Sequence, residues 1–77
     1  MSTGYSARII QQNSKADKSR LGVRLGKACI KRNIPVATVA SSIGVSRQTI
    51  YNWFIGASDP LNFMVPAIKN FLAFLNK

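Results

Sequence analysis

The chain has 77 residues and a mass of 8.4 kDa, a length that supports one small hydrophobic core. It contains 11 Lys and Arg residues, two Asp residues and neither His nor Glu, so its net charge is +9. This charge favours polyanionic partners such as nucleic acid or an acidic membrane surface. The composition cannot supply a serine–histidine pair, a tuned carboxylate pair or a tetrahedral zinc site. We therefore expect a binding protein without metal or cofactor, and not an enzyme.

The apolar residues are distributed as in a soluble domain. The longest unbroken apolar run, Phe71–Leu75, has five residues, whereas a membrane helix needs roughly 20. The polar N-terminus lacks the hydrophobic stretch of a signal peptide. The single cysteine, Cys29, suits a reducing compartment, and its apolar neighbours predict that it packs as a small hydrophobe. We expect a cytoplasmic protein that makes no contact with a membrane.

Residues 1–16 show no sustained hydrophobic period and are rich in small polar residues. This composition predicts a flexible basic N-terminal arm, on which Ile9 and Ile10 could still dock. Residues 17–77 are then the folded domain.

The first amphipathic helix is expected between Asp17 and Arg32. Asp17 or Ser19 is suited to cap its N-terminus. Gly22 and Gly26 either weaken this helix or permit a close neighbour. Its apolar stripe recurs at i, i+4, i+7 and i+8 and consists of Leu21, Leu25, Ala28 and Cys29.

Two short helices joined by a tight turn follow. Pro35 suits a first helical turn and Gly44 readily takes the positive φ of a helix end, which predicts a second helix from about Pro35 to Ser42. Ser46 is a good N-cap for a third helix, Arg47–Ile55, which Gly56 would close. The residues of the second helix expected to face inward are Val36, Val39, Ala40 and Ile43.

The C-terminal third predicts two more helical segments. Asp59 as cap and Pro60 as first residue indicate a helical start, and Pro66 divides the remainder into a short turn, Leu61–Val65, and a final helix, Pro66–Leu75. The expected apolar stripe of the final helix is Ala67, Ile68, Phe71, Leu72 and Leu75. The expected fold class is all-α, with about five short helices.

The sequence GVSRQTIYNW over residues 44–53 carries a resemblance to a known family. Together with a small residue at Ala40, Gly44 in the turn, and Gly56 and Pro60 beyond the third helix, it resembles the helix-turn-helix of Cro/C1-type (Xre-family) phage repressors. The likeness covers roughly residues 20–75. It implies a lambda-repressor-like DNA-binding domain and a transcriptional regulator that acts in the bacterial host cell, as a repressor that occludes a promoter.

The outward face of the third helix has the chemistry of base recognition. At 100° per residue, Gln48 and Asn52 lie almost opposite Ile50. Gln and Asn pair with adenine and Arg pairs with guanine in the major groove. Trp53 and Phe54 follow Ile50 at i+3 and i+4, and we expect them in the core. The resemblance places base contacts at Arg47, Gln48 and Asn52, and sometimes at Thr49.

Positive charge is concentrated before this motif. Eight Lys or Arg and one Asp give residues 8–32 a net charge of +7, whereas residues 33–60 are neutral overall. We expect phosphate affinity from the first segment and base reading from the third helix. Many of the resembling repressors carry a glutamine at the position of Val36, which contacts phosphate and supports the recognition helix. That contact is absent here, although backbone amides at the start of the second helix can bind phosphate. The predicted phosphate contacts are Lys31, Arg32, Thr38, Ser46 and Tyr51.

The C-terminal residues have more apolar surface than one short helix can bury, which predicts a homodimer. A two-fold dimer would bind double-stranded DNA at a palindromic operator, with half-sites roughly 34 Å apart. Two alternatives stay open: a small helix-turn-helix protein that inhibits a host protein such as RNA polymerase, and an architectural, excisionase-like protein that bends DNA. The apolar residues in question are Phe63, Met64, Phe71, Phe74 and Leu75.

Overall fold

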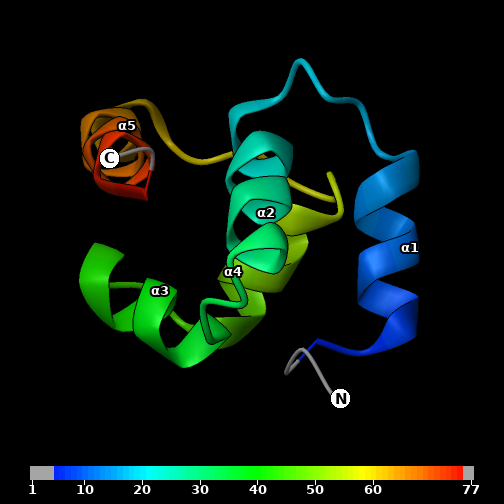
Figure 1. The fold of residues 1–77 in the computed structure, drawn as a ribbon. Helices are drawn as coiled ribbons and strands as arrows, with labels where there is room; N and C mark the ends of the chain where they lie inside the picture. The colour runs from blue at the N-terminus through cyan, green and yellow to red at the C-terminus, as the bar shows by residue number, and fades with distance from the viewer. Residues whose placement is uncertain (1–4, 76–77) are drawn as a thin grey trace.

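The computed structural model describes residues 5–75, which form five α-helices and one short 3-10 helix, without a strand in this range. The all-α fold class with five helices is confirmed. Helix α2 is central and has α1 on one side and α5 on the other, while α4 packs against it and α3 packs against α4 (Figure 1). The elements are α1 (Ala7–Lys15), α2 (Leu21–Lys31), α3 (Val36–Ile43), α4 (Arg47–Phe54), the 3-10 helix η1 (Asn62–Met64) and α5 (Val65–Leu75).

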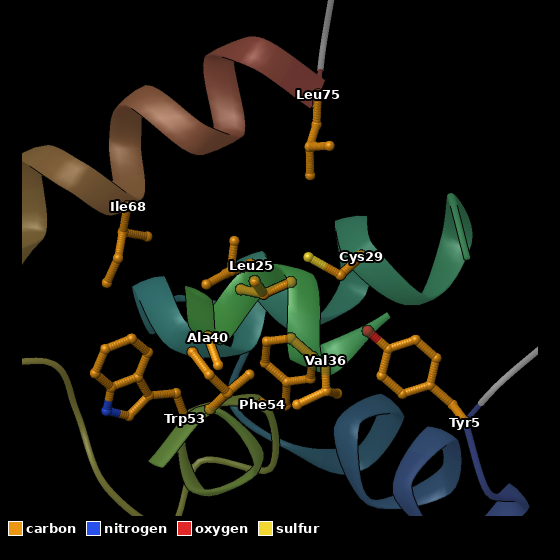
Figure 2. Close-up of a cluster of buried hydrophobic side chains, with 11 residues drawn as sticks. Tyr5, Leu25, Cys29, Val36, Ala40, Trp53, Phe54, Ile68 and Leu75 are labelled. Carbon is orange, nitrogen blue, oxygen red and sulfur yellow. The ribbon is translucent and has the colours of Figure 1, made fainter. Parts of the chain in front are cut away.

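The hydrophobic core lies where α2, α4 and α5 meet. Leu25 of α2, Phe54 of α4 and Ile68 of α5 are completely buried, and Ile68 points from α5 toward α2 (Figure 2). Each such side chain stabilises the fold by about 1.5–3 kcal/mol relative to exposure. Cys29 is buried among them, as predicted, and burial raises the pKa of its thiol to about 12. The thiol is therefore neutral at physiological pH and packs as an apolar group.

Two glycines allow α2 and α4 to approach closely. A Cβ atom built on Gly22 would lie 2.7 Å from the Cβ atom of Trp53 and 2.9 Å from its carbonyl oxygen. A Cβ atom on Gly26 would lie 2.7 Å from Cγ of Phe54 and 2.7 Å from Nδ2 of Asn13. No larger residue fits at these two positions without displacing a neighbour. The close helix approach that these glycines suggested is confirmed.

The prediction of a flexible arm over residues 1–16 is wrong for the described part, residues 5–16. Residues 7–15 form helix α1, and the Ser6 hydroxyl caps it by accepting a hydrogen bond from the Ile9 N–H over 3.2 Å. The side chain of Asn13 is buried, and its Nδ2 donates to the carbonyl oxygens of Val23, over 3.2 Å, and Phe54, over 2.7 Å. These bonds fix α1 to α2 and α4. Residues 1–4 lie outside the described residues.

Tyr5 adds a second attachment at the start of α1. Its ring is buried, 6.1 Å from that of Phe54 and tilted by 38° (Figure 2). Its hydroxyl donates to the carbonyl oxygen of Ile34, and burial raises the pKa of this phenol. Tertiary partners thus hold a segment whose own apolar content is low.

The start of α2 also differs from its prediction. Its N-cap is Arg20, and no side chain caps the helix. The carboxylate of Asp17 instead accepts hydrogen bonds from the N–H and hydroxyl of Ser19 just before the helix, and these bonds lower the pKa of that carboxyl. The polar residues form a local turn where a cap was expected.

Two expectations for the C-terminal third are wrong. Asp59 and Pro60 do not begin a helix; η1 begins at Asn62, after Leu61 as N-cap, and Asp59 instead forms an ion pair with Arg20. Ala67, expected to face the core, is exposed. The remaining residues of the predicted stripe of α5 are buried or half-buried: Ile68, Phe71, Leu72 and Leu75.

Candidate nucleic-acid interface

The turn between α3 and α4 follows its sequence signals. Gly44 ends α3 in the left-handed conformation, with φ of 90°, and its N–H donates to the Ala40 carbonyl oxygen over 2.8 Å. Ser46 caps α4 by accepting a hydrogen bond from the Thr49 N–H over 3.2 Å, and the two hydroxyls lie 2.9 Å apart. Both helices agree with their predicted bounds to within one residue. The polar chemistry that begins and ends these helices is local, which is why the sequence reveals it.

One side of α4 is anchored in the core. Ile50 and Phe54 are completely buried and Trp53 is 3% exposed, so the core positions predicted for all three are confirmed. Trp53 and Phe54 point from α4 toward α2 and away from solvent (Figure 2). This packing fixes the rotation of α4 about its own axis. It therefore fixes which residues the helix presents to solvent.

The opposite side of α4 is polar. Gln48 is exposed and Asn52 is half-buried opposite Ile50, and Arg47 is exposed in the first turn of the helix, on the same flank as Tyr51. The Gln48 side-chain nitrogen donates to the Asn52 side-chain oxygen over 3.1 Å, which aligns two amides one helical turn apart. This bond does not use the Gln48 carbonyl oxygen, the second N–H of Gln48 or either N–H of Asn52. We call Arg47, Gln48 and Asn52 the reading face.

Thr49 and Tyr51 occupy the flanks of α4. Both are half-buried. The Thr49 hydroxyl forms a hydrogen bond with the Ser46 hydroxyl, and Tyr51 packs against the core. Each leaves part of its side chain accessible beside the reading face. The predicted positions on the helix are therefore brought together, with Thr49 and Tyr51 on opposite flanks.

The loop after α4 is held by contacts on both sides. The Asn52 carbonyl oxygen accepts hydrogen bonds from the N–H groups of Ala57, over 2.9 Å, and Ser58, over 3.3 Å. Arg20 donates to the carbonyl oxygen of Gly56, and its Nε lies 3.6 Å from the Asp59 carboxylate. Arg20 was not singled out from the sequence for this role, because Gly56 is 36 residues away and no local pattern signals the contact.

The predicted phosphate contacts lie on several elements. Thr38 is exposed in the first turn of α3, Ser46 is exposed at the start of α4, and Arg32 is exposed in the turn between α2 and α3. Lys31 is the last residue of α2 and is also exposed. Lys31 projects from the side of α2 opposite to Gly22 and Gly26, so it does not lie beside the reading face.

The described residues form neither a metal site nor a membrane-spanning helix. Between residues 5 and 75, no three His, Cys, Asp or Glu side chains lie close enough to hold a metal ion. No helix in the same range has the length and hydrophobicity needed to cross a membrane. We found no protein-family model, curated protein or solved structure that matches this chain.

Proposed function

We propose that this chain is a sequence-specific, double-stranded DNA-binding transcriptional regulator in which α3 and α4 act as a helix-turn-helix. The observation that carries this proposal is the reading face, because α4 is anchored by Ile50, Trp53 and Phe54 while Gln48 and Asn52 are aligned on its solvent side. A rigid helix with fixed polar side chains is the arrangement that major-groove recognition requires.

The reading face offers distinct groups to bases. The amides of Gln48 and Asn52 can donate to and accept from one adenine edge, because their mutual bond leaves a carbonyl oxygen and N–H groups for the base. Arg47 at the N-terminus of α4 suits the two acceptors of guanine. Thr49 can contact a thymine methyl group from the flank. These four residues are the proposed base contacts.

Phosphate contacts would orient α4 in the groove. Thr38 and Ser46 lie at the N-termini of α3 and α4, where backbone N–H groups and the helix dipole favour anions. Arg32 adds charge at the junction of α2 and α3, and Tyr51 can donate its hydroxyl, whereas Lys31 projects from the far side of α2 and is not part of this set. These contacts supply affinity without sequence preference.

A homodimer would give this domain its specificity. One reading face spans only a few base pairs, whereas two copies related by a two-fold axis would read a palindromic operator. Three large apolar side chains that remain exposed in the C-terminal segment, Leu61, Phe63 and Phe74, support such an interface. A regulator of this kind acts in the cytoplasm of a bacterial host by covering a promoter.

Selection of bound sequences from a random pool of duplex DNA tests the proposal. An enriched palindrome is expected, and binding to it is expected to weaken with rising salt. On the enriched site, Gln48→Ala and Arg47→Ala are each expected to cost about 1–3 kcal/mol of binding free energy and to loosen the preference at one base position.

Arg32→Ala is the matched control for those two variants. It is expected to weaken enriched and random DNA alike and to make the log–log salt dependence shallower by about 1. Equal losses on both kinds of DNA for all three variants would contradict base reading by α4. Absence of binding to any duplex at low salt would favour a protein target instead.

A further inference from the structure

Three cations form a row along the outer face of α2. Arg24, Lys27 and Lys31 recur at i, i+3 and i+7, and all three are exposed. With a rise of 1.5 Å per residue, the row is about 10 Å long. The opposite side of the helix carries Gly22 and Gly26, which contact α4. We call the three cations the outer strip.

The outer strip faces away from the reading face. Trp53 and Phe54 turn from α4 toward the glycines of α2, whereas Gln48 and Asn52 are on the other side of α4. The order across the molecule is therefore reading face, α4, α2, outer strip. Because each helix is about 10 Å across with its side chains, the two surfaces lie roughly 20 Å apart. A straight duplex held by the reading face does not reach the outer strip at Arg24.

The outer strip works against the stability of α2. Like charges one turn apart repel each other, and Arg24 lies in the N-terminal part of α2, where the helix dipole disfavours a cation. The two acidic residues are engaged elsewhere, Asp17 with Ser19 and Asp59 with Arg20. The fold itself thus gives no reason for this row, whereas a bound polyanion would.

The surroundings of the strip favour phosphates over an acidic protein as its partner. Protein interfaces are built around buried aromatic and aliphatic side chains. The large exposed apolar residues, Leu61, Phe63 and Phe74, all lie in the C-terminal segment. Lys27 and Lys31 also form one edge of a cleft of about 290 Å³ between α1 and α2, whose other lining residues are the polar Asn13 and Ser14 and the half-buried Ile10 and Ile30, so it offers no large exposed apolar side chain. Phosphate binding needs cations alone.

We propose that the outer strip binds the phosphate backbone of a second DNA duplex, so that one protein molecule bridges two duplexes. The inference rests on the proposed function for the first duplex, which the reading face holds by its sequence. The second duplex is held by charge and without sequence preference. The test changes Arg24 and Lys27, the two strip residues farthest from α3, and leaves Lys31 unchanged.

A capture assay tests the bridge. A duplex with the enriched site is attached to beads and loaded with protein, and a labelled duplex of unrelated sequence is added at low salt. The wild-type protein is expected to capture the labelled duplex. Arg24→Gln with Lys27→Gln is expected to reduce capture about tenfold and to make its log–log salt dependence shallower by about 2, because two phosphate contacts are lost.

Lys18→Gln with Lys69→Gln is the matched control, because it removes the same charge from exposed positions outside the strip. It is expected to keep capture within about twofold of wild type, and both double variants are expected to bind the bead duplex with nearly unchanged affinity. Thermal melting is expected to show that the Arg24→Gln/Lys27→Gln protein is folded, since like-charge repulsion on α2 is relieved.

Three outcomes would overturn the bridge. Undiminished capture by the Arg24→Gln/Lys27→Gln protein would assign bridging to another surface, such as the second reading face of a homodimer. Capture that falls equally in both double variants would show that capture depends on the net charge of the protein and not on the position of the strip. A wild-type protein that holds the bead duplex yet captures no second one would show that the strip does not bind DNA, and would favour an acidic protein as its partner. Loss of the bead duplex itself would instead refute the proposed function.

Discussion

Asn13 ties three helices together through one side chain. Its amide nitrogen donates to the carbonyl oxygens of Val23 in α2 and Phe54 at the end of α4. A net hydrogen bond of this kind stabilises a fold by about 1 kcal/mol, and a buried acceptor left without a donor costs about 1–3 kcal/mol. Because Phe54 belongs to the helix that carries the reading face, Asn13 contributes to the position of α4.

Asn13→Asp tests this role with almost no change in shape. An oxygen replaces the donor, and a buried carboxylate then faces two carbonyl oxygens, so unfolding free energy at neutral pH is expected to fall by about 3 kcal/mol or more. Chemical denaturation measures the change. Gln12→Glu, at the exposed neighbouring position, makes the same change in charge and is expected to alter stability by less than about 0.5 kcal/mol. Similar losses for both variants would mean that charge, and not the buried amide, matters.

The buried thiol of Cys29 predicts a loss of stability at alkaline pH. Its pKa rises from 9.0 to about 12 in the folded protein because burial disfavours the thiolate. The unfolded chain therefore releases this proton first, and the stabilisation is complete below pH 9 and is lost as the pH rises toward 12. The expected slope from this group is on the order of 1 kcal/mol per pH unit.

Cys29→Ala isolates that slope. Its stability is expected to be lower overall, because a buried sulfur is removed, yet flatter between pH 9 and 10. Tyr5→Phe is the control, since the raised pKa of Tyr5 acts only above its ordinary value of 10.0. Urea titrations at several pH values measure both. An unchanged slope in Cys29→Ala would show that the thiol is not buried as described.

At the scale of helices, the approach of α2 to α4 depends on Gly22. Alanine favours an isolated helix over glycine by about 1 kcal/mol, so Gly22→Ala would stabilise α2 on its own. In the folded protein the added Cβ would meet the Cβ atom and carbonyl oxygen of Trp53, and neither can move without shifting α4. Overpacking is expected to prevail, with a net loss of about 1–3 kcal/mol in thermal or chemical unfolding.

Gly44→Ala separates crowding from backbone strain. Nothing lies within 4 Å of its added Cβ, but its φ of 90° is unfavourable for an L-residue, so a loss of about 1–2 kcal/mol is expected. Only Gly22→Ala is expected also to weaken DNA binding beyond its effect on stability, because it displaces α4. A Gly22→Ala protein as stable as wild type would refute the close packing of the two helices.

The sequence predicted the bounds of α3 and α4 well, because residues that favour the start or the end of a helix stand at those bounds. Pro35, Gly44 and Ser46 set the bounds of α3 and α4 through short-range chemistry that needs no tertiary partner. Helix α1 has a local cap, Ser6, but its central anchor is the polar Asn13, which in isolation is typical of an exposed segment. The partners that make it a buried anchor come from α2 and α4, distant in the chain, so helix periodicity could not reveal them.

For the whole molecule, the sequence showed that the basic segment and the proposed base contacts are different residues, but it could not show in which directions the two surfaces face. It located the net charge of +7 in residues 8–32 and the polar face of α4 opposite Ile50. Whether these surfaces meet the same duplex depends on which side of α2 touches α4. The contacts of Gly22 and Gly26 decide that question, and they turn Arg24 and Lys27 away from the reading face. The single molecule thus has two opposed polar surfaces.

The exposed aromatic residues of the C-terminal segment are expected to hold two copies of the chain together. Phe63 is 75% exposed and Phe74 is 67% exposed, and burial of each in a dimer would contribute about 1.5–3 kcal/mol. Phe74→Glu or Phe63→Glu is therefore expected to raise the dimer dissociation constant at least about tenfold. Sedimentation equilibrium measures the constant directly, and the melting temperature of the wild type is expected to rise with protein concentration.

Ala73→Glu is the control for Phe74→Glu, because it adds the same charge to an adjacent exposed position about 100° around α5. It is expected to leave the dissociation constant within about threefold of wild type. Because the proposed palindromic operator would need two copies, the Phe74→Glu protein is also expected to bind a half-site as well as wild type does, yet to lose its preference for the full operator. If wild-type protein sediments as a monomer at concentrations where it occupies the full operator, the exposed aromatic residues serve some other contact.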